Sequence, residues 1–72
     1  MKTLLITDRH SDSSRLSLMK IRKSVTLDKS AKLEVTEIMP WIRIRLEYDE
    51  NLHDTQILIN KLRAQKFVAA EI

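Results

Sequence analysis

The residues best suited to bind a ligand lie in the stretch Trp41–Tyr48, where apolar and polar side chains alternate. Trp41, Arg43 and Arg45 share one parity of this stretch. Because successive side chains of a β-strand point to opposite faces, these three would project from the same face. Guanidinium groups bind phosphates and reach guanine edges, and an exposed indole can stack on an unpaired base. This is the chemistry of nucleic-acid binding.

Further lysines and arginines extend this set. If the ambiguous stretch Leu18–Leu27 were a strand beside Trp41–Tyr48, with a helix behind the sheet, its outer side chains would join the arginines on one basic sheet face. The predicted nucleic-acid-binding residues are then Lys20, Arg22, Lys23, Lys29, Lys32, Trp41, Arg43 and Arg45. The alternative interpretation is a solvated sheet surface, whose charges keep the domain soluble and discourage edge pairing.

Charge is unevenly distributed along the chain. Residues 1–32 contain eight Lys and Arg and three Asp and Glu, whereas residues 33–72 contain five and seven, so the formal net charge of +3 comes from the amino-terminal half. This asymmetry favours acidic partners, nucleic acid first. Of the two nucleic acids, we expect DNA rather than RNA. The acidic half of one copy could also pair with the basic half of another.

The sequence contains no motif or spacing that favours a catalytic site or a metal site. The chain has no Gly and no Cys, which excludes glycine-rich phosphate loops and cysteine-based zinc sites. No spacing joins the serines to His10 or His53 as nucleophile and base. Asp8, His10 and Asp12 alternate within one loop, but no further ligand lies nearby, and serine-rich loops of this kind are commonly solvated. We therefore predict no enzyme activity, no cofactor and no metal.

The amino-terminal part of the chain predicts strands joined by polar loops. A short apolar run predicts a strand over Lys2–Thr7. Leu18–Leu27 fits a strand with a bulge near Leu18, and a helix from Ser14 with Leu16, Met19 and Lys23 on one side is the rival. Alternation predicts a strand over Lys32–Ile38, antiparallel to its predecessor, and another over Trp41–Tyr48 that continues the same ribbon or turns back beside it.

The carboxy-terminal part predicts a helix followed by a strand. The helix covers Leu52–Gln65, with Asn51 or Asp54 able to accept hydrogen bonds at its start. The segment 67–72 extends this helix or, the favoured alternative, forms a return strand. If this strand pairs in parallel with Trp41–Tyr48, the unit is a right-handed crossover.

Together these elements predict an α+β fold. Residues 1–72 form one small domain in which a three- to four-stranded, mainly antiparallel sheet carries one amphipathic helix on one face. A domain of this size without disulfides is commonly stabilised by self-association, so we expect a homodimer. No segment has the length of a membrane span, and we expect a cytoplasmic protein.

The functional hypothesis is a small nucleic-acid-binding regulator that uses the basic sheet face. The alternative is a protein-interaction module, such as a small inhibitor, antitoxin or phage-type regulator, that docks on a larger partner without touching nucleic acid. Salt separates the two, because phosphate binding weakens steeply as salt rises.

Overall fold

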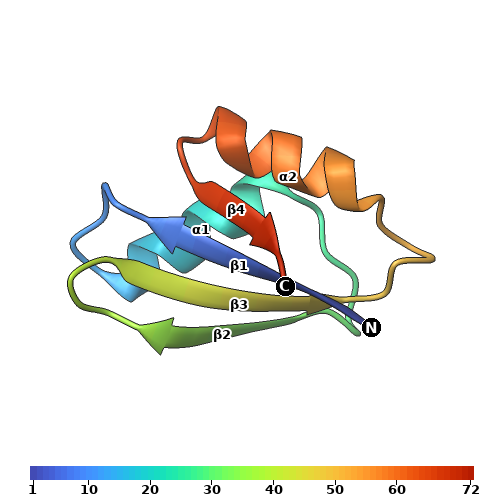
Figure 1. Cartoon of the computed structure of the whole chain (residues 1–72), viewed down its shortest axis with the longest axis horizontal. Coiled ribbons are helices and arrows are strands. Elements are labelled where there is room, and N and C mark those ends of the chain that lie inside the picture. Colours follow the sequence, from blue (N-terminus) through green and yellow to red (C-terminus); the bar gives the residue numbers. More distant parts are fainter.

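Four strands and two helices follow one another along the chain. The computed structural model describes all residues, 1–72. The elements are β1 (Lys2–Asp8), α1 (Ser14–Ser24), β2 (Lys32–Glu37), β3 (Ile42–Tyr48), α2 (Thr55–Ala64) and β4 (Val68–Glu71) (Figure 1). Neither helix is long and apolar enough to cross a membrane.

The four strands form one sheet in the order β2-β3-β1-β4, in which every neighbouring pair is antiparallel. The two edges are β2 and β4 (Figure 1). Strands β1 and β2 therefore run the same way with β3 between them, and β3 and β4 run the same way with β1 between them. Two interleaved βαβ units of this kind make the ferredoxin-like topology. That topology supports many unrelated functions, so it assigns none by itself.

One face of the sheet packs against both helices and forms the hydrophobic core. Strict alternation places the fully buried Leu4 and Ile6 of β1 against Leu46 and Ile44 of β3. The helices close this layer with the buried side chains Ile21, Leu58, Ile59 and Leu62, within one cluster of 13 residues. Burying each aliphatic side chain contributes about 1.5–3 kcal/mol. The α+β class and the antiparallel sheet are confirmed.

The predicted strand over Leu18–Leu27 is wrong, because most of this stretch belongs to α1. The helix buries Ser17 and Ile21, which are four residues apart, and Val25 follows at the same spacing. Leu16 and Met19, which the rival helix interpretation grouped with Lys23, instead lie on the outer side with 49% and 47% of their surface exposed. The apolar side of α1 is thin because a serine occupies one of its core positions.

The strand over Lys32–Ile38 is confirmed as β2, but its predicted partner is wrong. It pairs with β3 rather than with the preceding segment, which is helical. The chain thus turns back after β2 and forms a hairpin, the second of the two arrangements considered for Trp41–Tyr48. The register shifts between Val35 and Glu37, which marks a bulge in the edge strand.

The helix and strand predicted at the carboxy terminus are both present. Helix α2 begins at Thr55, three residues after the predicted start, and the Asp54 side chain caps it by accepting the Ile57 N–H at 3.1 Å. The favoured return strand is thus present as β4, which pairs antiparallel with β1. It runs parallel to β3 but does not pair with it, because β1 lies between the two strands.

Candidate nucleic-acid interface

Arg43 and Arg45 lie on the open face of the sheet, the face that no helix covers. Each is paired across the sheet with a glutamate. The Nη2 atom of Arg45 lies 2.6 Å from Oε2 of Glu34, and the Nε atom of Arg45 lies 3.7 Å from a carboxylate oxygen of Glu47. Arg43 lies 3.7 Å from Glu37. The hydrogen bond and the charge of Glu34 raise the pKa of Arg45. On the open sheet face, the positive charges of the two arginines are thus compensated by the negative charges of neighbouring glutamates.

Trp41 stands at the end of this face, just before β3. The guanidinium carbon of Arg9 lies 4.4 Å from the centre of the indole ring, a cation–π contact. The indole is 40% exposed, so it is available only in part for stacking on a base. Arg9 was not among the predicted residues, because nothing local in the sequence shows that the end of β1 lies opposite the start of β3.

The remaining predicted residues are divided among three places. Lys20, Arg22 and Lys23 lie on α1, which covers the other side of the sheet from Arg43 and Arg45. Lys29 lies in the loop between α1 and β2, and Lys32 lies on β2 opposite Glu47. The single basic sheet face is therefore not formed, and the reason is that the Leu18–Leu27 stretch is helical.

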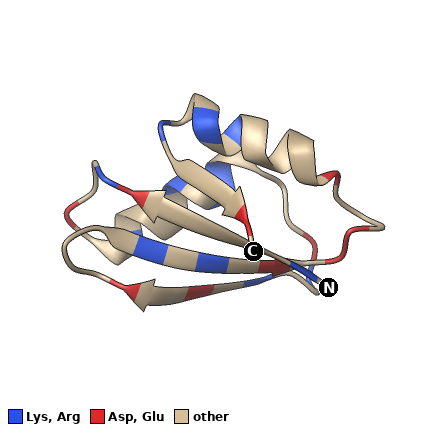
Figure 2. Ribbon diagram, in the orientation of Figure 1, with Lys and Arg blue, Asp and Glu red and all other residues tan.

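The two helices carry the unbalanced positive charge. They contain six Lys and Arg and no Asp or Glu, whereas the rest of the chain contains seven Lys and Arg and ten Asp and Glu. Figure 2 shows these basic positions on the helices and the acidic ones on strands and loops. We call the six residues the basic helix layer: Arg15, Lys20, Arg22, Lys23, Lys61 and Arg63.

All six side chains of the basic helix layer are exposed, and none lies within ion-pair distance of a carboxylate. Lys20 donates a hydrogen bond of 3.1 Å to the hydroxyl of Ser11. Their positive charges are available to an external anion.

The helix dipole explains part of this pattern. Arg22, Lys23, Lys61 and Arg63 lie in the last turns of their helices, where positive charge is stabilising. Arg15 lies in the first turn of α1, where positive charge opposes the dipole, and that turn has no acidic residue. Stability of the helices therefore does not account for the whole set.

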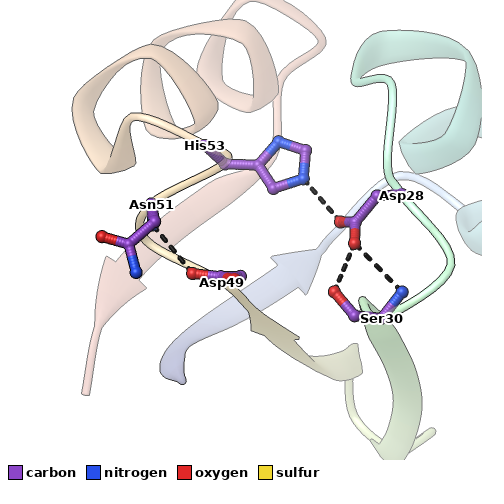
Figure 3. A network of polar contacts seen from close by, with 5 residues as sticks. All are labelled: Asp28, Ser30, Asp49, Asn51 and His53. Carbon is purple, nitrogen blue, oxygen red and sulfur yellow. Dashed lines mark hydrogen bonds and ion pairs between the residues drawn. The ribbon is translucent and has the colours of Figure 1, made fainter.

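A polar network joins the loop before β2 to the loop before α2 (Figure 3). His53 Nε2 lies 2.8 Å from Asp28 Oδ1, and the other carboxylate oxygen accepts hydrogen bonds from the N–H and hydroxyl of Ser30. The hydrogen bonds from Ser30 and His53 lower the pKa of Asp28 to about 2. The contact between Asp28 and His53 therefore holds the two loops together. Ser30 lies in the same loop as Asp28 and donates to its carboxylate, not to the imidazole of His53.

The Asp8, His10 and Asp12 loop does not converge on a common point outside the protein. Asp8 is 3% exposed and accepts hydrogen bonds from the His10 N–H at 2.9 Å and the Ser17 hydroxyl at 2.8 Å. No group of three or more His, Asp or Glu side chains is arranged to hold a metal ion.

The chain was also compared with known proteins. It matches no protein-family model, no curated protein and no solved structure.

Proposed function

We propose that this protein is a small regulator that binds nucleic acid, DNA in preference to RNA, through the exposed side of α1 and the adjoining basic residues of α2. The observation that supports the proposal is the basic helix layer, with six positive side chains, no acidic residue and no ion pair. Contacts of Lys and Arg with phosphates supply most of the affinity of non-specific nucleic-acid binding.

The shape and composition of α1 suit duplex DNA. Its 11 residues form a rod about 16 Å long, and the major groove of B-DNA admits an α-helix. At 3.6 residues per turn, Arg15 and Arg22 lie along one border of the exposed side and Lys20 lies along the other. Leu16 and Met19 lie between these borders, where they are able to contact thymine methyl groups.

The open sheet face suits nucleic acid less well. Sheets that bind single-stranded RNA present aromatic side chains on which bases stack. The outward positions of the central strands β1 and β3 here are Thr3, Leu5, Thr7, Arg43, Arg45 and Glu47, with no aromatic residue among them. The two arginines are engaged with glutamates. Both features favour the helices as the binding surface and the duplex as the ligand.

The test is fluorescence anisotropy of a labelled DNA duplex at low and physiological salt, repeated with single-stranded RNA. The variant Arg15→Gln/Lys23→Gln removes two charges from the basic helix layer, and Arg43→Gln/Arg45→Gln removes the same charge from the open sheet face. We expect the helix variant to weaken duplex binding by at least about tenfold and the sheet variant to stay within about twofold. Circular dichroism checks that both variants are folded, and light scattering checks that both keep the mass of the wild type, because Arg43 and Arg45 lie on the face through which we propose below that the protein dimerises.

Three results would contradict this proposal. Absence of duplex binding at low salt removes nucleic acid as the partner. Loss of binding in the sheet variant alone moves the interface to Arg43 and Arg45. Equal losses in the two variants indicate a response to net charge rather than a defined surface.

We further propose that the protein acts as a homodimer through the open sheet face. The sheet edges are poorly suited to pairing, because β2 has a bulge and exposed charges and β4 has only four residues. The open face instead presents two apolar side chains that are partly exposed, Val68 on β4 and Trp41 just before β3. Light scattering should give the mass of two chains, and Val68→Lys should convert the dimer into a monomer. A monomeric wild-type protein contradicts this part of the proposal.

A further inference from the structure

A cavity of about 430 Å³ opens where the end of α1, the following loop and β2 meet. Four of its eight lining residues are apolar, and we call these four its floor: Val25, Leu27, Ala31 and Leu33, all of which belong to the hydrophobic core or pack against it. Binding cavities for small molecules commonly have volumes of about 300–1,000 Å³ and combine apolar walls with a few polar groups. The cavity therefore has the size of a small-molecule site, and its lining is half apolar and half polar.

Two positive side chains, Arg22 and Lys29, also line the cavity. Neither forms an ion pair with a carboxylate. Their two charges exceed the sum of the single negative charge of Asp28, which also lines the cavity, and the roughly half negative charge that the carboxyl end of α1 contributes. The electrostatic field in the cavity therefore favours an anion.

The one carboxylate in the lining is already occupied. Asp28 accepts hydrogen bonds from the backbone N–H and hydroxyl of Ser30 and contacts His53 Nε2 at 2.8 Å (Figure 3). Its negative charge remains in the lining, but these contacts hold both of its oxygens towards Ser30 and His53. The same contacts attach the cavity loop to the loop before α2, so the wall is held in place before a ligand arrives, which reduces the entropic cost of binding.

We propose that this cavity binds a small organic anion. Its phosphate or carboxylate group contacts Arg22 and Lys29, and its apolar part rests on Leu27, Ala31 and Leu33. The site is separate from the proposed nucleic-acid surface except at Arg22, which borders both. Variants of Lys29 and Ala31 therefore test the cavity without changing the basic helix layer.

The test is an amide ¹H–¹⁵N NMR titration of the full chain with phenyl phosphate, which carries an anionic group on an apolar ring. We expect saturable shifts confined to the amides around residues 25–33. Lys29→Gln should weaken binding about tenfold, because it removes a charge-assisted contact. Lys66→Gln, the same substitution in the turn before β4, should leave the affinity within about twofold. Ala31→Phe should fill the floor and abolish binding.

Parallel titrations with benzoate, inorganic phosphate and phenol define the ligand class. Tighter binding of phenyl phosphate than of benzoate identifies phosphate as the preferred anionic group, and the reverse identifies carboxylate. Either result supports the site if inorganic phosphate and phenol bind more weakly than both. Equal binding of inorganic phosphate shows that the apolar floor is unused, and equal binding of phenol shows that the cations are unused, so either overturns the proposal.

Two further outcomes overturn the proposal directly. One is the absence of shifts around residues 25–33 up to the solubility limit of phenyl phosphate. The other is an equal loss of affinity in Lys29→Gln and Lys66→Gln, which would indicate binding to net charge. If Ala31→Phe fails to fold, the comparison of the two lysine variants still decides the matter, because both lysines are exposed.

Discussion

The hydroxyl of Ser17 lies 2.8 Å from a carboxylate oxygen of Asp8, and both side chains are buried. This contact joins the end of β1 to the first turns of α1. Burial raises the pKa of the Asp8 carboxyl, but hydrogen bonds from Ser11, the His10 N–H and Ser17, together with the charge of Lys20, outweigh it and leave the pKa below its usual value. An ionised carboxylate therefore lies at the border of the core with its partners in place.

Ser17→Ala should destabilise the protein by about 1–3 kcal/mol, because it leaves a buried carboxylate with one hydrogen bond fewer. Urea denaturation measures the change. Ser24→Ala is the matched control in the same helix, since the exposed hydroxyl of Ser24 bonds only to the Lys20 carbonyl. Its effect should be smaller than about 0.5 kcal/mol. Equal effects in the two variants would show that the Asp8 contact contributes nothing special.

Substitutions at Ile21 and Met19 test which side of α1 packs on the sheet. Ile21 is fully buried and Met19 is about half exposed. Ile21→Val should cost about 0.5–1.5 kcal/mol, and Ile21→Ala about 2–5 kcal/mol, because the variants leave an unfilled space in the core. Met19→Ala should change stability by less than about 0.5 kcal/mol. Thermal melts of the three variants make the comparison. A larger effect at Met19 than at Ile21 would contradict the orientation of α1.

Acid should weaken the clamp between Asp28 and His53. The pKa of Asp28 in the folded protein is about 2, below its ordinary value of 3.8. Folding therefore favours the ionised form, and the stabilisation is complete above pH 3.8 and is lost as the pH falls towards about 2. We expect Asp28→Asn to be less stable than the wild type at neutral pH, with the difference shrinking across this interval.

Urea midpoints measured at descending pH provide this comparison. Asp12→Asn is the control, because Asp12 is an exposed carboxyl outside the network. The wild type and the control should lose stability in parallel. A difference between the wild type and Asp28→Asn that stays constant down to pH 2 would show that the clamp does not depend on the charge of Asp28.

Salt should report how many side chains of the basic helix layer contact phosphates. For duplex DNA the logarithm of the binding constant falls with the logarithm of the salt concentration, with a slope of about −0.9 per phosphate neutralised. Six contacts would give a slope near −5, and Arg15→Gln/Lys23→Gln should reduce its magnitude by about 2. Anisotropy titrations at several salt concentrations measure both slopes. An unchanged slope in this variant would place the phosphate contacts elsewhere.

The elements whose pattern is local could be predicted from the sequence. Alternation over Trp41–Tyr48 specified β3 almost to the residue, and the same signal identified β2. The apolar spacing and the capping Asp54 specified α2. These patterns are reliable because each element is amphipathic in its own right, so its period is visible without knowledge of its partners.

Long-range contacts determine which strands are neighbours and that most of Leu18–Leu27 is helical. Ser17 is a polar residue, and a sequence pattern would place it on the exposed side of a helix. Its hydrogen bond to Asp8 allows it to be buried, so the buried side of α1 could not be identified from the local sequence. The place of β4 beside β1 likewise depends on which edge of the sheet is free.

The candidate surface changed for the same reason. Lys20, Arg22 and Lys23 are basic in any fold, but a helix places them on the opposite side of the sheet from Arg43 and Arg45. The number of charges is a property of the sequence. Long-range strand pairing determines which positive side chains face solvent and which face a glutamate. The pairing of Arg45 with Glu34 is an example, and it exists only in the folded chain.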